Sequence, residues 1–249
     1  MKILSIDTAS DICGVSILED KNLIINLDNN TGRTHSENLM PMIRQALNLV
    51  NIPLKDIDFI VCDKGPGSFT GIRIGVSTAK AFQDSLAIPC VGVSSLEALA
   101  YNMISQNNSS NTKNAQLVCS ILDCKNDNCY FALYEKKENY YDTLVEPQSE
   151  DINSAIPILK SYIADNFDNF DISFIGDGSK IFEIQIKEIF ENVQIADEKL
   201  NTLNSYNLGL CGLEKYKNGS WLEEELLPLY LKKPQAQRQL EEQSEVLWI

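Results

Sequence analysis

The stretch that decides the fold is KGPGSFTGIRIGVSTAKAF, at residues 64–82. It follows FIVC at 59–62, an apolar run that predicts a buried strand. The glycines of the turn suit a tight reversal, because glycine adopts positive φ at no steric cost. Small and apolar residues then recur on one side of a helix predicted over 71–86, namely Ile72, Gly75, Val76, Ala79 and Phe82. A strand, a glycine turn and a helix in this order are typical of α/β proteins.

Upstream of this stretch, strands are predicted at 2–6, 13–20 and 22–28, and their short turns indicate an antiparallel start to a sheet. Thr34 and Glu37 fit a capping box that would begin a helix over 36–50. Pro41 lies inside that pattern, so we expect a kink or a delayed start. Downstream, a strand at 88–94 and a helix at 95–104 continue the alternation that parallel crossover units show.

The polar segment SQNNSSNTKN at 105–114 has little apolar surface to bury and is predicted to be a loop or a domain joint. The pattern then begins again. Strands are predicted at 116–123 and 129–136, and 171–179 is predicted to be a strand that runs into a glycine turn. Helices are predicted at 151–167, 180–190 and 204–219. Because both halves contain a hairpin and later a strand, a glycine turn and a helix, a duplicated α/β unit is the simplest interpretation.

Composition narrows the class of protein. The 249 residues have a formal net charge of −14, which repels nucleic-acid phosphates over most of the surface. Seven cysteines cannot all pair internally, and reduced thiols suit the cytoplasm. The first residues lack the apolar run of a secretion signal, and no apolar stretch reaches the ~18 residues of a membrane span. We therefore expect a soluble cytoplasmic protein.

Two groups of residues are candidates for contact with a nucleotide or another anion. Gly65, Gly67 and Ser68 precede a helix whose first amides could face an anion. Asp7 and Thr8 end the first strand, where a carboxylate and a hydroxyl could meet a nucleotide or a metal-bound phosphate. The spacing fits neither a Walker A loop nor a Rossmann fingerprint. A tightly packed structural turn explains the same residues, so both interpretations stay open.

His35 is the only histidine, so any histidine-dependent catalysis would have to use it. It lies in the first turn of a predicted helix, where a surface or interface position is the simpler interpretation. A metalloprotease motif with two histidines is excluded.

From its first strand to its tail, the chain resembles the TsaB (YeaZ) family. The matching blocks occur in order: ILSIDTAS at 3–10, HSENLMPMI at 35–43, KGPGSFTGIRIGVSTAKAF at 64–82, GVSSLEALA at 92–100, IGDG at 175–178 and PLYLKKPQAQRQLEE at 228–242. The resemblance implies the actin-like ATPase fold (ASKHA, RNase H-like) of Hsp70 and hexokinase, an α/β architecture of two lobes. Each lobe would hold a mixed five-stranded sheet with flanking helices. We place the lobes at 1–104 and 115–249, and the last helix, 204–219, is a candidate to pack back on the first lobe.

The same resemblance implies a role in making threonylcarbamoyl-adenosine (t6A) next to the tRNA anticodon. In such systems TsaC makes threonylcarbamoyl-AMP, TsaD transfers the group to tRNA, TsaB binds TsaD, and the ATPase TsaE joins them. The implied partners are therefore TsaD and TsaE, with a homodimer where TsaD is absent and tRNA contacted only through the complex. No tightly bound cofactor is expected, and ATP or ADP at the interface with partners stays open.

Comparison with TsaD, a paralogue, indicates that this chain is not the catalytic subunit. The block of TsaD equivalent to GVSSLEALA has two metal-binding histidines, four residues apart on a helix. Those positions here are Ser95 and Leu99, and leucine cannot bind a metal. We expect no metal and a non-catalytic adaptor. An independent nucleotide-dependent enzyme of the actin-like class is the alternative, and a metallopeptidase is disfavoured by the same two positions.

The resemblance also implies that the helices at 36–50 and 71–86 meet matching helices of TsaD, or of a second copy. The candidate contacts on these helices and at their start are His35, Ser36, Leu39, Met42, Ile43, Ile72, Gly75, Ala79 and Phe82. Some of them could instead face the chain's own sheet.

Overall fold

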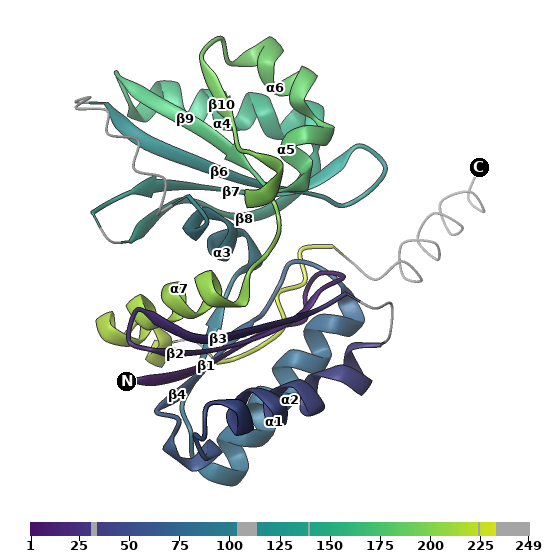
Figure 1. Cartoon of the computed structure of the whole chain (residues 1–249). Helices are drawn as coiled ribbons and strands as arrows, with labels where there is room; N and C mark the ends of the chain where they lie inside the picture. Colours follow the sequence, from purple (N-terminus) through teal and green to yellow (C-terminus); the bar gives the residue numbers. More distant parts are fainter. Residues whose placement is uncertain (31–33, 104–113, 139, 224, 233–249) are drawn as a thin grey trace.

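The computed structural model describes residues 1–30, 34–103, 114–138, 140–223 and 225–232. It has two lobes, each built around one five-stranded sheet (Figure 1). The polar segment predicted at 105–114 lies almost wholly outside the described residues. Within the described residues, the chain returns from the second lobe to the first after the tenth strand.

The first sheet has the strand order β3-β2-β1-β4-β5. Its strands are β1 (Lys2–Asp7), β2 (Cys13–Glu19), β3 (Asn22–Asn29), β4 (Phe59–Asp63) and β5 (Cys90–Val93). β1, β2 and β3 are antiparallel neighbours, whereas β1, β4 and β5 run parallel. All five residues of β4 are buried, as expected for an inner strand covered on both faces.

Helices cover both faces of this sheet (Figure 1). On one face lie α1 (His35–Leu49) and α2 (Phe69–Leu86), with the short η1 (Leu54–Asp56) between them in the chain. On the other face lies α7 (Ser205–Asn218), with α3 (Ser95–Tyr101) beside it. A Cβ at Gly212 would collide with Val61 of β4, so glycine allows α7 to pack close against the sheet.

The second sheet has the order β10-β9-β6-β7-β8. Its strands are β6 (Ala115–Asp123), β7 (Asn128–Lys136), β8 (Tyr141–Asp151), β9 (Phe170–Ile175) and β10 (Val193–Ile195). The helices of this part of the chain are α4 (Ile152–Asn166), α5 (Asp177–Ile181), α6 (Glu183–Ile189), η2 (Glu198–Leu200) and η3 (Ser220–Glu223). Read from β8 to β10, this sheet has two antiparallel pairs and then two parallel pairs, as the first sheet has from β3 to β5. The predicted α/β class, with a mixed five-stranded sheet in each lobe, is confirmed.

Several local predictions are corrected. The capping box is wrong, because Thr34 makes no side-chain cap; its hydroxyl instead lies 3.1 Å from that of Ser36. The helix begins at His35 and runs on past Pro41 without a delayed start. The predicted helix at 180–190 is two short helices, α5 and α6. Residue patterns missed β8 and β10, whereas the family resemblance implied five strands in each sheet.

Asn102, just after α3, is bonded to the segment that follows β10 and to α7. Its amide donates to the carbonyls of Leu200 and Thr202, at 2.7 and 2.9 Å, and its oxygen accepts from Asn207 at 2.6 Å. Asn102 is itself buried, and the three bonds are partly buried. They hold the end of α3 against the segment that leads from β10 into α7.

Candidate functional site

The glycine turn packs directly on the end of β1. A Cβ at Gly67 would collide with the carbonyl oxygen of Ala9, and one at Gly71 with that of Thr8. The amide of Ser68 donates to the Ala9 carbonyl at 2.7 Å, and the Thr8 hydroxyl donates to the Gly71 carbonyl at 2.8 Å. Close packing between two turns therefore accounts for the glycines at 67 and 71.

Ser68, predicted to contact an anion, is the N-cap of α2. Its hydroxyl oxygen accepts from the Gly71 amide at 3.2 Å, which satisfies one of the first amides of the helix. Gly65 has a φ of 99°, a conformation that strains other residues, and is followed by a cis peptide bond to Pro66. The local geometry thus serves the turn itself, while Gly67 and Ser68 stay exposed at its surface.

Asp7 and Asp63 form a buried acidic pair at the ends of β1 and β4. One Asp63 oxygen, Oδ1, accepts from the Ser95 hydroxyl and from the Gly65 amide, both at 2.7 Å, whereas Oδ2 is buried without a partner. Burial raises the pKa of Asp63 to about 7. Burial and the neighbouring charge of Asp63 raise the pKa of Asp7, despite a bond from the Ala9 amide. The pair therefore favours a protonated state that a surface aspartate would not.

His35 joins the start of α1 to the turn after β1. Its Nε2 lies 2.8 Å from the carbonyl oxygen of Ser10, so Nε2 holds the proton that is donated. Its Nδ1 is buried without a partner, and its ring lies against Gly71. His35, expected at a partner surface, thus makes an internal contact and is only half-buried.

A cleft of about 470 Å³ lies between the lobes. The first lobe contributes Ala9, Ser10, Asp11, Pro66, Gly67 and Ser68, and the later part of the chain contributes Leu122, Asp123, Cys124, Lys125, Tyr130, Asp177 and Leu203. Of the five predicted anion contacts, the structure brings Gly67 and Ser68 to this cleft. Asp7, Thr8 and Gly65 are not among its lining residues and are buried. The residues at 122–130 were missed, because a hairpin of the second half gave no sign of facing the first.

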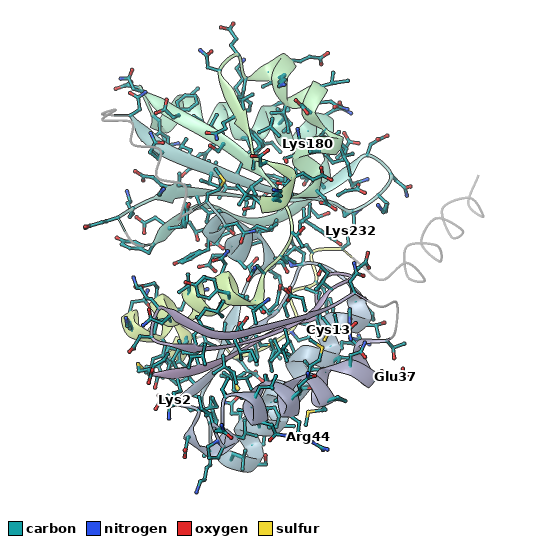
Figure 2. The ribbon with its side chains drawn as sticks, viewed as in Figure 1. Lys2, Cys13, Glu37, Arg44, Lys180 and Lys232 are labelled. Carbon is teal, nitrogen blue, oxygen red and sulfur yellow. The ribbon has the colours of Figure 1, made fainter. Side chains whose placement is uncertain are left out.

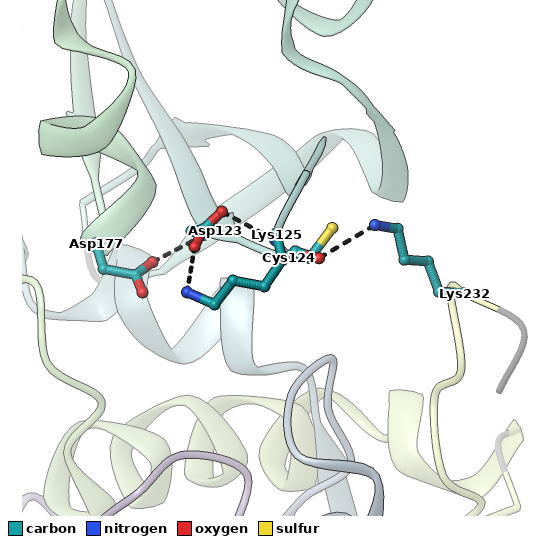
Figure 3. A network of polar contacts seen from close by, with 5 residues as sticks. All are labelled: Asp123, Cys124, Lys125, Asp177 and Lys232. Atoms are coloured by element: carbon teal, nitrogen blue, oxygen red, sulfur yellow. Dashed lines mark hydrogen bonds and ion pairs between the residues drawn. The ribbon is translucent and has the colours of Figure 1, made fainter. Parts of the chain in front are cut away.

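The wall formed by the β6–β7 hairpin is polar (Figure 3). The Asp123 carboxylate lies 2.6 Å from the Lys125 ammonium, and the Asp123 amide donates to Asp177 at 2.9 Å. On the other side of the hairpin, Lys232 donates to the Cys124 carbonyl at 3.2 Å. Three carboxylates, those of Asp11, Asp123 and Asp177, against one lysine make the lining acidic. An anionic ligand would therefore need a cation or a partner's basic groups to offset this charge.

The positions expected to have lost metal ligands have internal roles. Ser95 is fully buried and bonded to Asp63, and Leu99 is fully buried in the core beside Gly176. Within the ranges that the structure describes, no three histidine, cysteine or acidic side chains are grouped so as to hold a metal ion. No helix in those ranges is both long and apolar enough to cross a bilayer.

Most of the predicted partner contacts lie in the chain's own core. The buried ones are Leu39, Met42, Ile43, Ile72, Gly75 and Ala79, while Phe82 is half-buried and Ser36 is exposed. The buried positions are covered within the chain itself, which is the alternative that the sequence left open for some of them. The partner surface itself stays a prediction.

The outer side of α1 offers other residues. Met40 and Leu49 are 46% and 60% exposed, large values for apolar side chains. They line a groove of about 410 Å³ with Pro41, Arg44, Gln45 and Asn48. Glu37 and Arg44, labelled in Figure 2, lie on this same outer side of the helix.

Two lobes, each with an equivalent mixed five-stranded sheet, give the chain the actin-like fold. The family model described as TsaD: tRNA N6-adenosine threonylcarbamoyltransferase matches residues 27–240. The tRNA threonylcarbamoyladenosine biosynthesis protein TsaB of Bacillus subtilis is 34% identical over 160 residues, or 64% of this chain and 66% of that protein. The protein of the same name in Escherichia coli is 32% identical over 139 residues, 56% of this chain and 57% of its own length.

Among solved structures, YeaZ from Pseudomonas aeruginosa superposes with a TM-score of 0.72 at 21% identity, covering 92% of this chain and 99% of that one. This likeness shows the fold. The chain belongs to the family of the matching model, as a member of its TsaB (YeaZ) group. The aligned part of the chain spans between about half and two thirds of the length of those two curated relatives.

Proposed function

We propose that this protein takes part in t6A biosynthesis as a non-catalytic adaptor, required when TsaD transfers the threonylcarbamoyl group to the adenosine next to the tRNA anticodon. The curated relatives are named for this biosynthesis. In this proposal the chain binds TsaD and, with it, TsaE, forms a homodimer when TsaD is absent, and acts in the cytoplasm. It meets tRNA through the complex, because a net charge of −14 opposes binding on its own.

The observation that supports the adaptor role most directly is the state of Ser95 and Leu99. At the positions where the family resemblance implies metal-binding histidines in TsaD, one side chain bonds to a buried carboxylate and the other packs in the core. Introducing ligands there would break the bond to Asp63 and displace core packing. These residues therefore favour a structural use of the region.

The test is reconstitution of tRNA modification from purified TsaC, TsaD, TsaE and this chain, leaving out one protein at a time. The modified nucleoside is quantified by mass spectrometry of digested tRNA. We expect omission of this chain to reduce modification at least a hundredfold, and co-purification to recover it with TsaD. Full activity of the other proteins without it would contradict the proposal.

A nucleotide-dependent enzyme of the actin-like class is the second candidate, favoured by the interlobe cleft beside the exposed Gly67 and Ser68. The acidic lining opposes it, because Asp11, Asp123 and Asp177 repel phosphates unless a cation or a partner intervenes. ATP turnover by the purified chain, alone and with TsaD and TsaE, distinguishes the two. Turnover by the chain alone would favour the enzyme.

A further inference from the structure

After α7 and η3, residues 225–232, here called the strap, return along the first lobe. Leu226 is buried, and its Cδ1 lies against Gly92 of β5. The amide of Leu229 donates to the carbonyl of Lys64, directly after β4, at 2.7 Å. Glu225 and Lys80 of α2 form an ion pair at 2.8 Å. The strap is thus attached to the first lobe by its backbone and by its side chains.

The aromatic ring of Tyr230 strengthens this attachment at the start of α2. Arg73 Nε donates to the Tyr230 hydroxyl at 2.7 Å, and the Arg73 guanidinium lies 3.8 Å from the centre of the Phe69 ring. The rings of Phe69 and Tyr230 are themselves 4.8 Å apart. A cation over an aromatic ring is favourable, and here the Phe69 ring contacts both the Arg73 guanidinium and the Tyr230 ring, so the cluster limits the positions open to the residues that follow.

Two residues later the strap reaches the other lobe. The Lys232 ammonium donates to the carbonyl of Cys124, in the hairpin that walls the interlobe cleft (Figure 3). Asp177 binds the same hairpin from the opposite side, through the amide of Asp123. Hydrogen bonds within the hairpin, such as that from the Cys124 amide to the Asn128 carbonyl at 3.0 Å, set the shape of the turn, while Lys232 and Asp177 contact it from outside.

We propose that the strap ties the two lobes together and sets the width of the interlobe cleft, with Tyr230 anchored on the first lobe and Lys232 holding the hairpin of the second. Asn102 bonds the end of α3 to the segment after β10, and the strap adds a separate link at the cleft. Release of Lys232 lets the hairpin move away from the Gly67–Ser68 turn. Because Arg73 lies on α2, a partner that binds the outer side of that helix and engages Arg73 would compete with Tyr230 and loosen the strap.

The test measures lobe separation and local opening in the isolated full chain, so it does not depend on the proposed function. Spin labels are placed on Lys55→Cys and Glu188→Cys, exposed positions in different lobes. Six native cysteines are buried, and the seventh is removed as Cys124→Ser, which keeps the carbonyl that Lys232 contacts. Double electron–electron resonance then gives the distribution of distances between the two spin labels, one on each lobe. Hydrogen–deuterium exchange, in the unlabelled chain, follows the amides of 123–128.

The variants are Lys232→Met, which keeps the aliphatic stem, and Tyr230→Phe, which keeps the ring. Lys217→Met, an exposed lysine of α7, is the matched control. We expect Lys232→Met to broaden the distance distribution and to speed hairpin exchange about twofold to tenfold. Tyr230→Phe should act in the same direction, while α4 and the control stay unchanged. Faster hairpin exchange with an unchanged interlobe distance would mean that Lys232 stabilises only the hairpin, and this would overturn the proposal. No change in either measurement would overturn it as well.

Discussion

At the residue scale, the buried carboxyl group of Asp63 makes the stability of the fold depend on pH. Its pKa is raised from 3.8 to about 7 because burial disfavours the charged form. Between these values the folded state binds more protons than the unfolded state does, so the free energy of unfolding falls as pH rises. A neutral isostere at this position should remove the part of that slope that Asp63 contributes, since an amide oxygen can accept the same two hydrogen bonds. Asp7, whose pKa burial also raises, keeps its own part.

We predict that Asp63→Asn flattens the decline in unfolding free energy between pH 4 and 7, by about 2–4 kcal/mol over the range. The measurement is urea denaturation at half-unit pH steps, compared with the parent chain. Asp165→Asn, at an exposed position of α4, is the control and should leave the profile unchanged. An identical profile for Asp63→Asn and the parent would show that Asp63 titrates normally.

We predict that Gly71→Ala destabilises the fold by about 3 kcal/mol or more, because the added methyl group meets the Thr8 carbonyl, a backbone atom that cannot rotate away. Ser77→Ala, at an exposed position of the same helix, should change stability by less than about 0.5 kcal/mol. Thermal and chemical denaturation measure both variants. A stable Gly71→Ala protein would mean that the two turns are not held in contact.

We predict that His35→Ala leaves tRNA modification by the full complex within about tenfold of the parent, below the 10²–10⁴-fold typical of general acid–base catalysis. The variant loses the bond to the Ser10 carbonyl, a loss of about 1 kcal/mol in stability. His35→Gln is a companion variant, because its amide can donate to the same carbonyl. A thousandfold rate loss with folding and TsaD binding intact would favour the enzyme interpretation.

At the scale of the element, α1 presents two different faces. Its inner face, with Leu39 and Ile43, belongs to the core, and its outer face exposes Met40 and Leu49 beside the groove. Exposed apolar side chains that line a groove are the residues expected to become buried against a partner. The helical period alone does not say which apolar residues are outside, because this helix has some on both faces.

We predict that Met40→Asp and Leu49→Asp each fold normally and weaken binding to TsaD at least tenfold, as measured by isothermal titration calorimetry. Light scattering should show weaker self-association of the same variants in the absence of TsaD. Ile184→Asp, 73% exposed in the second lobe, is the control and should bind as the parent does. Met42→Asp should instead unfold the protein, because it buries a charge in the core. Unchanged binding by both outer variants would move the partner surface elsewhere.

At the scale of the whole molecule, the two lobes contain equivalent sheets that different helices cover, and a cleft lies between the lobes. Metal analysis tests the molecule as a whole. We predict well under one transition-metal ion per chain in untagged protein, since Leu99 cannot bind a metal and Ser95 is bonded to Asp63. Inductively coupled plasma mass spectrometry after dialysis is the measurement. About one iron or zinc per chain would contradict the adaptor interpretation, which rests on the absence of metal ligands at positions 95 and 99.

The sequence by itself determined the α/β class, the positions of most strands and helices, and the family. Local signals suffice for these, because apolar period and glycine turns act within a few residues, and the block at 64–82 is specific. β10 was missed because it has three residues, too few for a period to show, and β8 because its side chains alternate poorly between buried and exposed. The capping box was wrong because the side chain of Thr34 contacts Ser36 and not the helix amides.

Only the tertiary structure decided the site. It showed that Gly67 and Gly71 are required because the turn after β1 packs against them. It also showed that Asp7 and Asp63 lie close enough in the core for each charge to affect the other. Lys232 contacts Cys124, which lies 108 residues earlier in the chain. Each of these relations joins segments far apart in sequence, and burial and pKa depend on every group that packs around a side chain. A pattern along the chain records which residues are apolar, but the packing of the lobes determines which of them remain exposed.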